Sequence, residues 1–232
     1  MAEYRLRFGK LNNLRFLSHL NLLKTMERSI RRAGLPLAFS EGFHPHPKIS
    51  YGPALAVGIE STSEFLDLEL TAGLEASSIM DSLNLALPRG LQIYESKRIK
   101  STAKPLNAII NKASYQALLQ TNISHVTQLR QDCELLLQAT ELSVSRTGKD
   151  GKKLVNIRPW LHNLAIEEKS GGLLEIYLEG EVGNRGNLRP EEIFSRISPP
   201  FTVLKIIRNG LWYEEKGLVK QPMDFDGDFN HD

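Results

Sequence analysis

The histidines are the residues of this chain best suited to acid–base chemistry. His44 and His46 alternate with prolines in the segment FSEGFHPHPKISYGPALAVGIE, residues 39–60. Proline fixes its own φ and pushes the preceding residue toward an extended backbone, so a stiff loop should hold both rings outward. Together with His19, which opens a predicted helix, they could supply acid–base chemistry near neutral pH. His19, His44 and His46 are therefore the candidate catalytic residues.

The same loop carries Lys48 and Tyr51. Function concentrates on loops that a rigid scaffold positions, which favours a binding or catalytic surface. The alternative is a proline-rich crossover between two strands. The His-x-His spacing fixes no third metal ligand, so we predict no metal site and no cofactor.

Positive charge is grouped along the chain, although the formal net charge is only +2. Residues 5–48, 97–112 and 146–158 are basic, whereas acids gather in 60–81 and 167–192. This grouping predicts a positive surface able to meet phosphate, the alternative being solvated faces that never converge. The candidate nucleic-acid contacts are Lys24, Arg28, Arg31, Arg32, His44, His46, Lys48, Tyr51, Lys152, Lys153, Arg158 and Arg189.

Composition narrows the class of protein. The apolar fraction of 41% and the charged fraction of 24% over 232 residues are typical of a globular protein with a sizeable core. The single Cys133 excludes an internal disulfide framework, so we expect a reducing, cytoplasmic location. The chain has no apolar run of about 18 residues, so no membrane span is expected.

Known catalytic signatures do not occur. The chain has no Walker motif, no GxGxxG after a strand, no GxSxG and no HExxH. Cys133 lies on the apolar face of a predicted helix, which indicates a structural thiol.

Alternating and helical apolar spacing predicts two similar runs of elements. In the first run we expect strands at 3–10, 37–40, 64–70 and 91–99, and helices at 18–33 (inward face Leu20, Leu23, Met26, Ile30 and Ala33) and 75–87. In the second run we expect strands at 112–121, 142–145, 154–157, 173–178 and 203–208, and helices at 124–139 and from Pro190. A two-residue turn is expected at Asn209-Gly210.

This order predicts an α+β fold made of two tandem ferredoxin-like (βαββαβ) units, with a proline/glycine-rich insertion in the first. The predicted domains are residues 1–100 with the insertion at 40–60, a linker at 101–111, a second unit at 112–215 and an acidic, disordered tail at 216–232.

Several blocks of the sequence resemble a known family. The blocks FLSHLNLL, RAGLPLAFSEGFHPHPKISYGPALAVGIES, EFLDLEL, VNIRPWL and GNLRPEEIF resemble those of a bacterial radical-SAM-associated domain family of unknown function. The resemblance implies a domain that is often attached to a radical SAM protein, also occurs alone, and is encoded near ribonuclease E/G and ribosomal proteins. This chain has no cysteine triplet, so a radical SAM partner would be another polypeptide.

These observations predict a non-catalytic accessory protein that binds RNA or presents a substrate, linked to RNA modification or processing and to radical SAM systems. One alternative is an RNA-processing or RNA-modifying enzyme that uses the loop histidines. Another is a protein-interaction partner of a separate radical SAM enzyme. The expected partner is tRNA or rRNA. The family resemblance implies a separate radical SAM enzyme or ribonuclease E/G as a further partner. No association with a membrane is expected.

Overall fold

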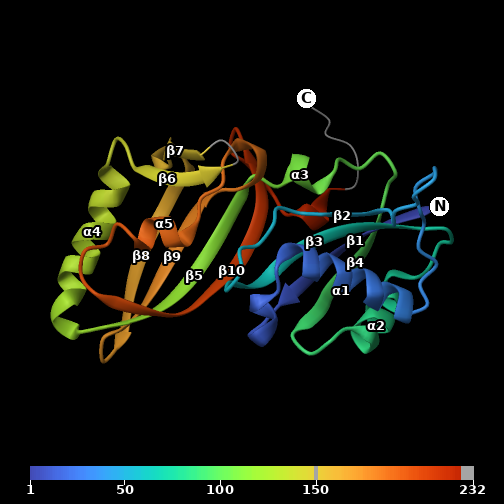
Figure 1. The fold of residues 1–232 in the computed structure, drawn as a ribbon, viewed down its shortest axis with the longest axis horizontal. Coiled ribbons are helices and arrows are strands. Elements are labelled where there is room, and N and C mark those ends of the chain that lie inside the picture. Colours follow the sequence, from blue (N-terminus) through green and yellow to red (C-terminus); the bar gives the residue numbers. More distant parts are fainter. Residues whose placement is uncertain (149–150, 226–232) are drawn as a thin grey trace. The chain divides into compact units, whose positions relative to one another are not determined.

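The computed structural model describes residues 1–148 and 151–225, and it is α+β as expected. The chain divides into two compact units, one made of Met1–Ile110 with the chain from Leu211 onward, the other of Asn111–Gly210. Figure 1 shows the strands and helices of each. No helix in these ranges is long and apolar enough to cross a membrane.

The first unit follows the predicted order of elements closely. It contains β1 (Ala2–Lys10), a 3-10 turn η1 (Asn12–Phe16), α1 (His19–Arg32), β2 (Ile49–Tyr51), β3 (Glu60–Leu70), α2 (Ala76–Ala86), β4 (Leu91–Ile99) and a short α3 (Leu106–Ile109). Strand β1 pairs antiparallel with β3 and with β4, and β2 pairs antiparallel with β3. The last helix, α3, falls inside the segment predicted as a linker.

Alternation along β1 produces the core of this unit. Tyr4, Leu6 and Phe8 face the same side and are buried together with side chains from α1 and α2, which lie side by side in Figure 1. Helix α1 begins where predicted, because the Ser18 hydroxyl accepts a hydrogen bond from the Asn21 amide at 3.3 Å. It ends before Gly34, whose φ of +69° suits the left-handed residue after a helix.

The second strand lies later than predicted. Residues 37–40 make only isolated bridges, at Leu37 and Phe39, and the paired strand is Ile49–Tyr51. The alternation of Ile49 and Tyr51 was masked by the glycines and prolines around them. The inward face of α1 is also shifted, since Leu22, Met26, Ser29 and Ile30 are buried whereas Leu20 is 68% exposed.

The opposite face of the first sheet is organised around Arg5, whose side chain is fully buried. Its Nε and Nη2 donate to the two Asp67 carboxylate oxygens at 2.7 and 2.8 Å. Further bonds run to the carbonyls of Pro222 (2.8 Å) and Lys104 (3.2 Å). Burial raises the pKa of Asp67, and its hydrogen bonds to Arg5 oppose that shift. Arg5 therefore ties β1 and β3 to two segments that are remote in the sequence.

The C-terminal segment belongs to this unit. After β10 (Phe201–Glu215), the chain turns at Lys216 and Gly217, with φ of +49° and +80°, values that suit a tight hairpin. It then forms β11 (Leu218–Lys220), which pairs with β10, and a 3-10 turn η5 (Pro222–Asp224). The rest of the predicted tail lies outside the described residues.

The second unit contains β5 (Lys112–Thr121), α4 (Val126–Gln138), β6 (Ser143–Gly148), β7 (Gly151–Asn156), β8 (Leu161–Ser170), β9 (Leu173–Glu181), α5 (Pro190–Phe194) and the first part of β10. Its sheet has the order β10-β5-β9-β8, and β6 and β7 form a separate two-stranded sheet. The apolar face expected for this helix was Val126, Leu129, Cys133, Leu136 and Leu137, of which the first four are buried and Leu137 is partly buried.

Two sequence predictions fail in this unit for identifiable reasons. Strand β8 was missed because its register shifts between Leu161 and Asn163, which interrupts the period of two. The turn at Asn209-Gly210 is absent, since β10 runs straight through it. There the Ser114 hydroxyl donates to the Asn209 side chain at 2.7 Å, a contact that local turn preference does not include.

Asp132 joins α4 to the segment before β10. Its carboxylate accepts from the Ser198 amide and from the Gln128 side chain, both at 2.8 Å. The bond from Ser198, followed by that from Gln128, holds the pKa of Asp132 below its ordinary value, against the opposing effect of burial. The ionised form is thus the one that the fold stabilises.

The Asp67–Arg5 pair gives a first test. Asp67→Asn leaves the buried guanidinium without a counter-charge and should lower the free energy of unfolding by about 3–5 kcal/mol. The matched control is Glu95→Gln, which removes the partner of Arg7 in an exposed pair 3.5 Å apart. The control should cost under about 1 kcal/mol. Urea titrations measure both, and equal effects would contradict this role for Arg5.

Asp132 gives a second test, in which pH is varied. Asp132→Asn should cost about 1–3 kcal/mol at neutral pH. Because the folded pKa is depressed, the carboxylate's contribution is complete above its ordinary value of 3.8 and is lost as the pH falls through the lower folded value. The stability difference between wild type and variant should therefore shrink in acid. Glu134→Gln, exposed on the same helix, should show no such difference, and a pH-independent gap would refute the argument.

Candidate nucleic-acid interface

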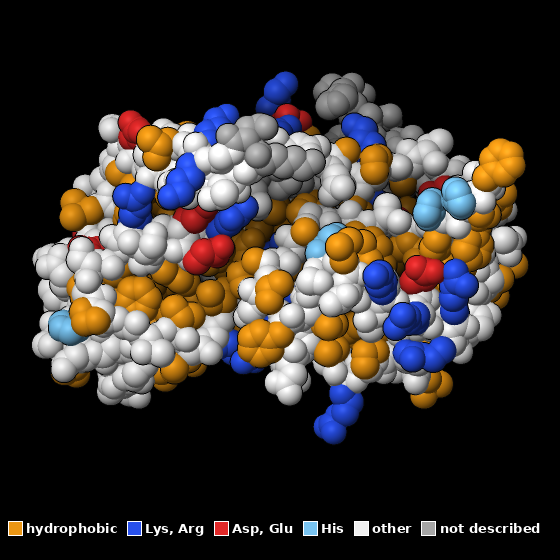
Figure 2. All heavy atoms as spheres, viewed as in Figure 1, with side chains coloured by type: hydrophobic (Ala, Val, Ile, Leu, Met, Phe, Trp, Pro, Cys, Tyr) orange, Lys and Arg blue, Asp and Glu red, His pale blue; other side chains and the backbone are white. Residues whose placement is uncertain are grey.

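The α1 surface, defined as Lys24, Arg28, Arg31 and Arg32, is the most concentrated group of the predicted contacts. All four side chains are exposed, and Figure 2 shows Lys and Arg side chains gathered over this helix. They reach solvent because the opposite side of α1 supplies Leu22, Met26 and Ile30 to the core.

The four cations differ in their bonding. Arg31 forms an ion pair with Glu27 at 2.8 Å, and Arg32 donates to the carbonyl of Ala86, at the end of α2, also at 2.8 Å. Lys24 and Arg28 make neither a hydrogen bond nor an ion pair with any described residue. These two are the cations that a phosphate could reach without displacing an internal partner.

A compact turn follows α1, here called the histidine turn, residues 40–46. Its base is closed by the bridge between Phe39 and Pro47 and by a hydrogen bond from the Ser40 amide to the His46 carbonyl at 2.8 Å. His44 and His46 are both exposed, as the stiff-loop argument predicted. The Arg31 guanidinium lies over the Phe39 ring, 5.4 Å from its centroid. The turn therefore begins beside the α1 surface.

His19 is placed differently from the other two histidines. Its ring contacts Tyr51 edge-on, with 6.3 Å between the centroids. Burial, and then the nearby Glu27 carboxylate, raise the pKa of Tyr51, and its hydroxyl is buried without a partner. Tyr51 is thus half-buried rather than presented for stacking. The three histidines do not form a metal-binding group, and none with three or more His, Cys, Asp or Glu occurs among the described residues.

Lys48 is exposed but also has a partner within the first unit. It forms an ion pair with Glu69 at 2.9 Å, and both lie on the sheet face that carries Asp67. A phosphate at Lys48 would have to compete with that carboxylate.

The predicted contacts of the second unit divide in the same way. Lys152 and Lys153 on β7, and Arg189 before α5, are exposed. Arg158 instead donates to the carbonyls of Ala139 and Leu161, at 2.9 and 2.7 Å, and to the carbonyl of Leu137. Since Leu137 and Ala139 end α4, Arg158 caps that helix.

Trp160, the aromatic beside the basic segment 146–158, packs within the second unit. The Trp160 ring carries the Arg146 guanidinium 5.0 Å from its centroid and lies so close to Gly186 that an added Cβ would be 2.5 Å away. Cys133 is buried on α4, and burial raises the pKa of its thiol to about 11, which favours the predicted structural role.

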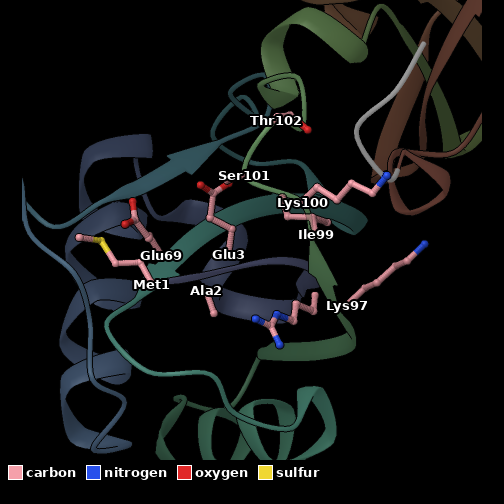
Figure 3. Close-up of a pocket in the computed structure, with 10 residues that line it drawn as sticks. Met1, Ala2, Glu3, Glu69, Lys97, Ile99, Lys100, Ser101 and Thr102 are labelled. Carbon is pink, nitrogen blue, oxygen red and sulfur yellow. The ribbon is translucent and has the colours of Figure 1, made fainter. Parts of the chain in front are cut away.

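A hollow of about 790 Å³ lies elsewhere on the first unit, lined by Glu3, Glu69, Lys97, Arg98, Lys100 and the neighbouring backbone. Burial, followed by Glu69 and Asp67, raises the pKa of Glu3 there. In Figure 3 the Lys97 and Lys100 side chains extend away from Glu3 and Glu69, and Lys97 donates to the Met223 carbonyl at 3.0 Å. The cations of the hollow therefore do not converge on one ligand.

Phe43 is an exposed aromatic that stands with Tyr51 and Trp160 beside the basic segments but is not among the predicted contacts. Its relative exposure is 102%, whereas Tyr51, which was chosen, is half-buried. A usable signal was present. Tyr51 and Ile49 alternate as in a strand, so their side chains are expected to face a core. Phe43 lies between Gly42 and Pro45, which favour a turn, so its ring is expected to face solvent.

Residues 3–190 match a family described as an uncharacterized protein conserved in bacteria (DUF2344). The chain belongs to this family. The match includes α1, the histidine turn and the β6–β7 hairpin. No curated protein matches the chain.

Similar solved structures come from two protein complexes. A chain of a Cbf5-Nop10-Gar1 complex has a TM-score of 0.48 and 10% identity, covering 90% of this chain and 48% of its own length. A chain of an archaeal box H/ACA sRNP Nop10-Cbf5 complex has a TM-score of 0.41 and 9% identity, with coverages of 88% and 46%. This chain thus spans about half the length of these two chains.

Arg158 offers a test that separates a structural arginine from a surface one. Arg158→Gln removes charged hydrogen bonds to the last carbonyls of α4 and should lower the free energy of unfolding by about 1.5–3 kcal/mol. Lys153→Gln, which changes the same charge on the exposed β6–β7 hairpin, should have an effect within about 0.5 kcal/mol. Thermal unfolding followed by circular dichroism measures both, and a neutral Arg158→Gln would contradict the capping role.

Proposed function

We propose that the protein binds RNA without catalysing a reaction on it, using the α1 surface and the histidine turn. The observation that carries the proposal is the exposure of Lys24 and Arg28, which lack partners among the described residues, beside a turn that displays two histidines and an aromatic ring. Cations of this kind are available to phosphate, and aromatic rings beside them suit bases.

The sign of the local charge favours a polyanion such as RNA over a basic or neutral partner. Helix α1 carries Lys24, Arg28, Arg31 and Arg32 against Glu27 alone. Arg15, which stacks 4.6 Å from the Phe16 ring centroid, adds a further positive side chain just before the helix, although it also pairs with Glu60 at 3.4 Å. A polyanion would be attracted to this side of the first unit over about a Debye length.

The second unit adds Lys152, Lys153 and Arg189 to the proposed contacts. These three residues remain proposed RNA contacts because they are exposed and form no ion pair with any residue that the structure describes. Arg158, Lys48 and Tyr51 are proposed to act indirectly, by holding α4, the histidine turn and the start of α1 in position.

We also propose that each unit is ferredoxin-like. In the first, β4, β1, β3 and β2 follow one another across the sheet, which places the fourth, first, third and second strands in that order. In the second, β10, β5, β9 and β8 repeat the same order once the β6–β7 hairpin is set aside as an insertion. The insertion then lies between α4 and the second strand of that unit.

The other partners and roles stay predictions. A separate radical SAM enzyme or ribonuclease E/G is implied by the sequence resemblance, and co-purification from the native host would test it. For acid–base chemistry by His19, His44 or His46, the diagnostic result is a His44→Ala variant that binds RNA normally but loses turnover.

The proposal predicts salt-dependent binding to RNA. Affinity for bulk tRNA, measured by fluorescence anisotropy, should fall steeply as salt is raised, because bound cations release counterions from the phosphates. The double variant Lys24→Gln/Arg28→Gln should weaken binding and reduce the slope of log affinity against log salt by about 1–2.

The matched control removes two charges from exposed positions of the first unit outside α1, as Arg98→Gln/Lys216→Gln. This control should keep the wild-type slope. Absent or salt-insensitive binding by the wild-type protein would refute the proposed function, and an equal loss in both double variants would refute the assignment to α1.

A further inference from the structure

Phe43 lies at the tip of the histidine turn with nothing of the described chain against it. Its relative exposure of 102% is the highest among the exposed large hydrophobic residues. Covering an exposed aromatic ring removes apolar surface from water and lowers the free energy. A rigid, exposed ring is therefore suited to contact a ligand. The question is which kind of ligand would cover it.

The turn holds this ring out at low entropic cost. Pro45 and Pro47 fix their φ angles, and Gly42 adopts a φ of +114° that other residues rarely reach. The His46 amide donates to the Ser40 hydroxyl at 2.9 Å, and the Ser40 amide donates to the His46 carbonyl at 2.8 Å. The backbone of the turn is therefore constrained before any ligand arrives.

Positive charge lies at the base of the turn, although the turn itself also carries the acidic Glu41. Phe39, at the base of the turn, lies under the Arg31 guanidinium, and His44 and His46 flank the tip. Three residues separate Phe43 from Pro47 and from Phe39, so the tip lies within about 10–14 Å of the base. Figure 2 shows His side chains on the same face as the Lys and Arg side chains over α1. A ligand that covers Phe43 and extends about 10–14 Å therefore reaches the base of the turn, where the Arg31 guanidinium lies.

We propose that Phe43 stacks on an unpaired nucleobase of an RNA strand whose phosphates contact the α1 surface. This assignment rests on the proposed function and narrows it to RNA that is single-stranded at this point. Within an A-form duplex the bases are paired and stacked on one another, so the ring could reach a base only in a loop, a bulge or an end. Stacking is tolerant of sequence, because every base presents a π-face.

The test compares two fluorescein-labelled RNAs of about 12 nucleotides per strand, one single-stranded and one fully duplex. Wild type should prefer the single strand, and Phe43→Ala should weaken single-strand binding roughly 5- to 150-fold while leaving duplex binding unchanged. Phe43→Trp should retain affinity, and Phe43→Leu, which keeps apolar surface but lacks a ring, should behave as Phe43→Ala.

The control Leu135→Ala removes another exposed apolar side chain, on α4 and outside the proposed contacts, and should bind as wild type. Since Phe43 has no internal contact to lose, all Phe43 variants should keep the wild-type thermal midpoint.

Each failure has a distinct meaning. If wild type binds neither RNA, the proposed function falls. If wild type binds both RNAs equally, or Phe43→Ala binds the single strand normally, RNA binding stands and the stacking assignment is overturned. Retained affinity in Phe43→Leu would also overturn stacking, and so would Phe43-dependent capture of a protein in place of RNA.

Discussion

The first unit depends on satisfying one buried guanidinium. Removing Arg5 from water costs several kcal/mol, and the fold recovers that cost only if the hydrogen-bond donors of the guanidinium meet acceptors. Asp67 supplies the counter-charge from the adjacent strand, while the carbonyls of Lys104 and Pro222 supply the remaining bonds. The segments around residues 104 and 222 are therefore fixed on this face of the sheet by chemistry rather than by apolar contact alone.

Covering that face leaves the helix side of the first unit as its outward surface. The buried stripe of α1 belongs to the core, so its remaining positions are free to carry charge. Arg32 illustrates how the two roles meet, since it bonds to the end of α2 and still lies at the surface. The arginines that bind carbonyls inside the protein, Arg5 and Arg158, have no exposed fork to offer a phosphate. Residue type alone does not separate these two roles.

Regular periodicity made much of the fold predictable, and irregular backbone limited it. Tyr4, Leu6 and Phe8 alternate without interruption, and β1 lies where they place it. Strand β8 was not predicted, because a register shift after Leu161 puts Leu161 and Leu164 out of the period of two that identifies a strand. The exposed His44 and His46 followed from their prolines, because that constraint is local. The bonds of Lys48 and Arg158 could not be predicted in this way. Their partners are Glu69 and the end of α4, which lie about 20 residues away in the sequence and follow from no local pattern.

The bond from Arg5 to Pro222 joins residues 217 positions apart, and the whole second unit is synthesised between them. At about 5–20 residues per second, Arg5 leaves the ribosome on the order of 10–40 s before its last acceptor exists. Until then the Nη1 group of Arg5 lacks its carbonyl acceptor and must be hydrated. The first unit is thus the first to be started and the last to be completed. The second unit, Asn111–Gly210, is fully synthesised before Pro222, so it can fold before Arg5 forms its last hydrogen bond.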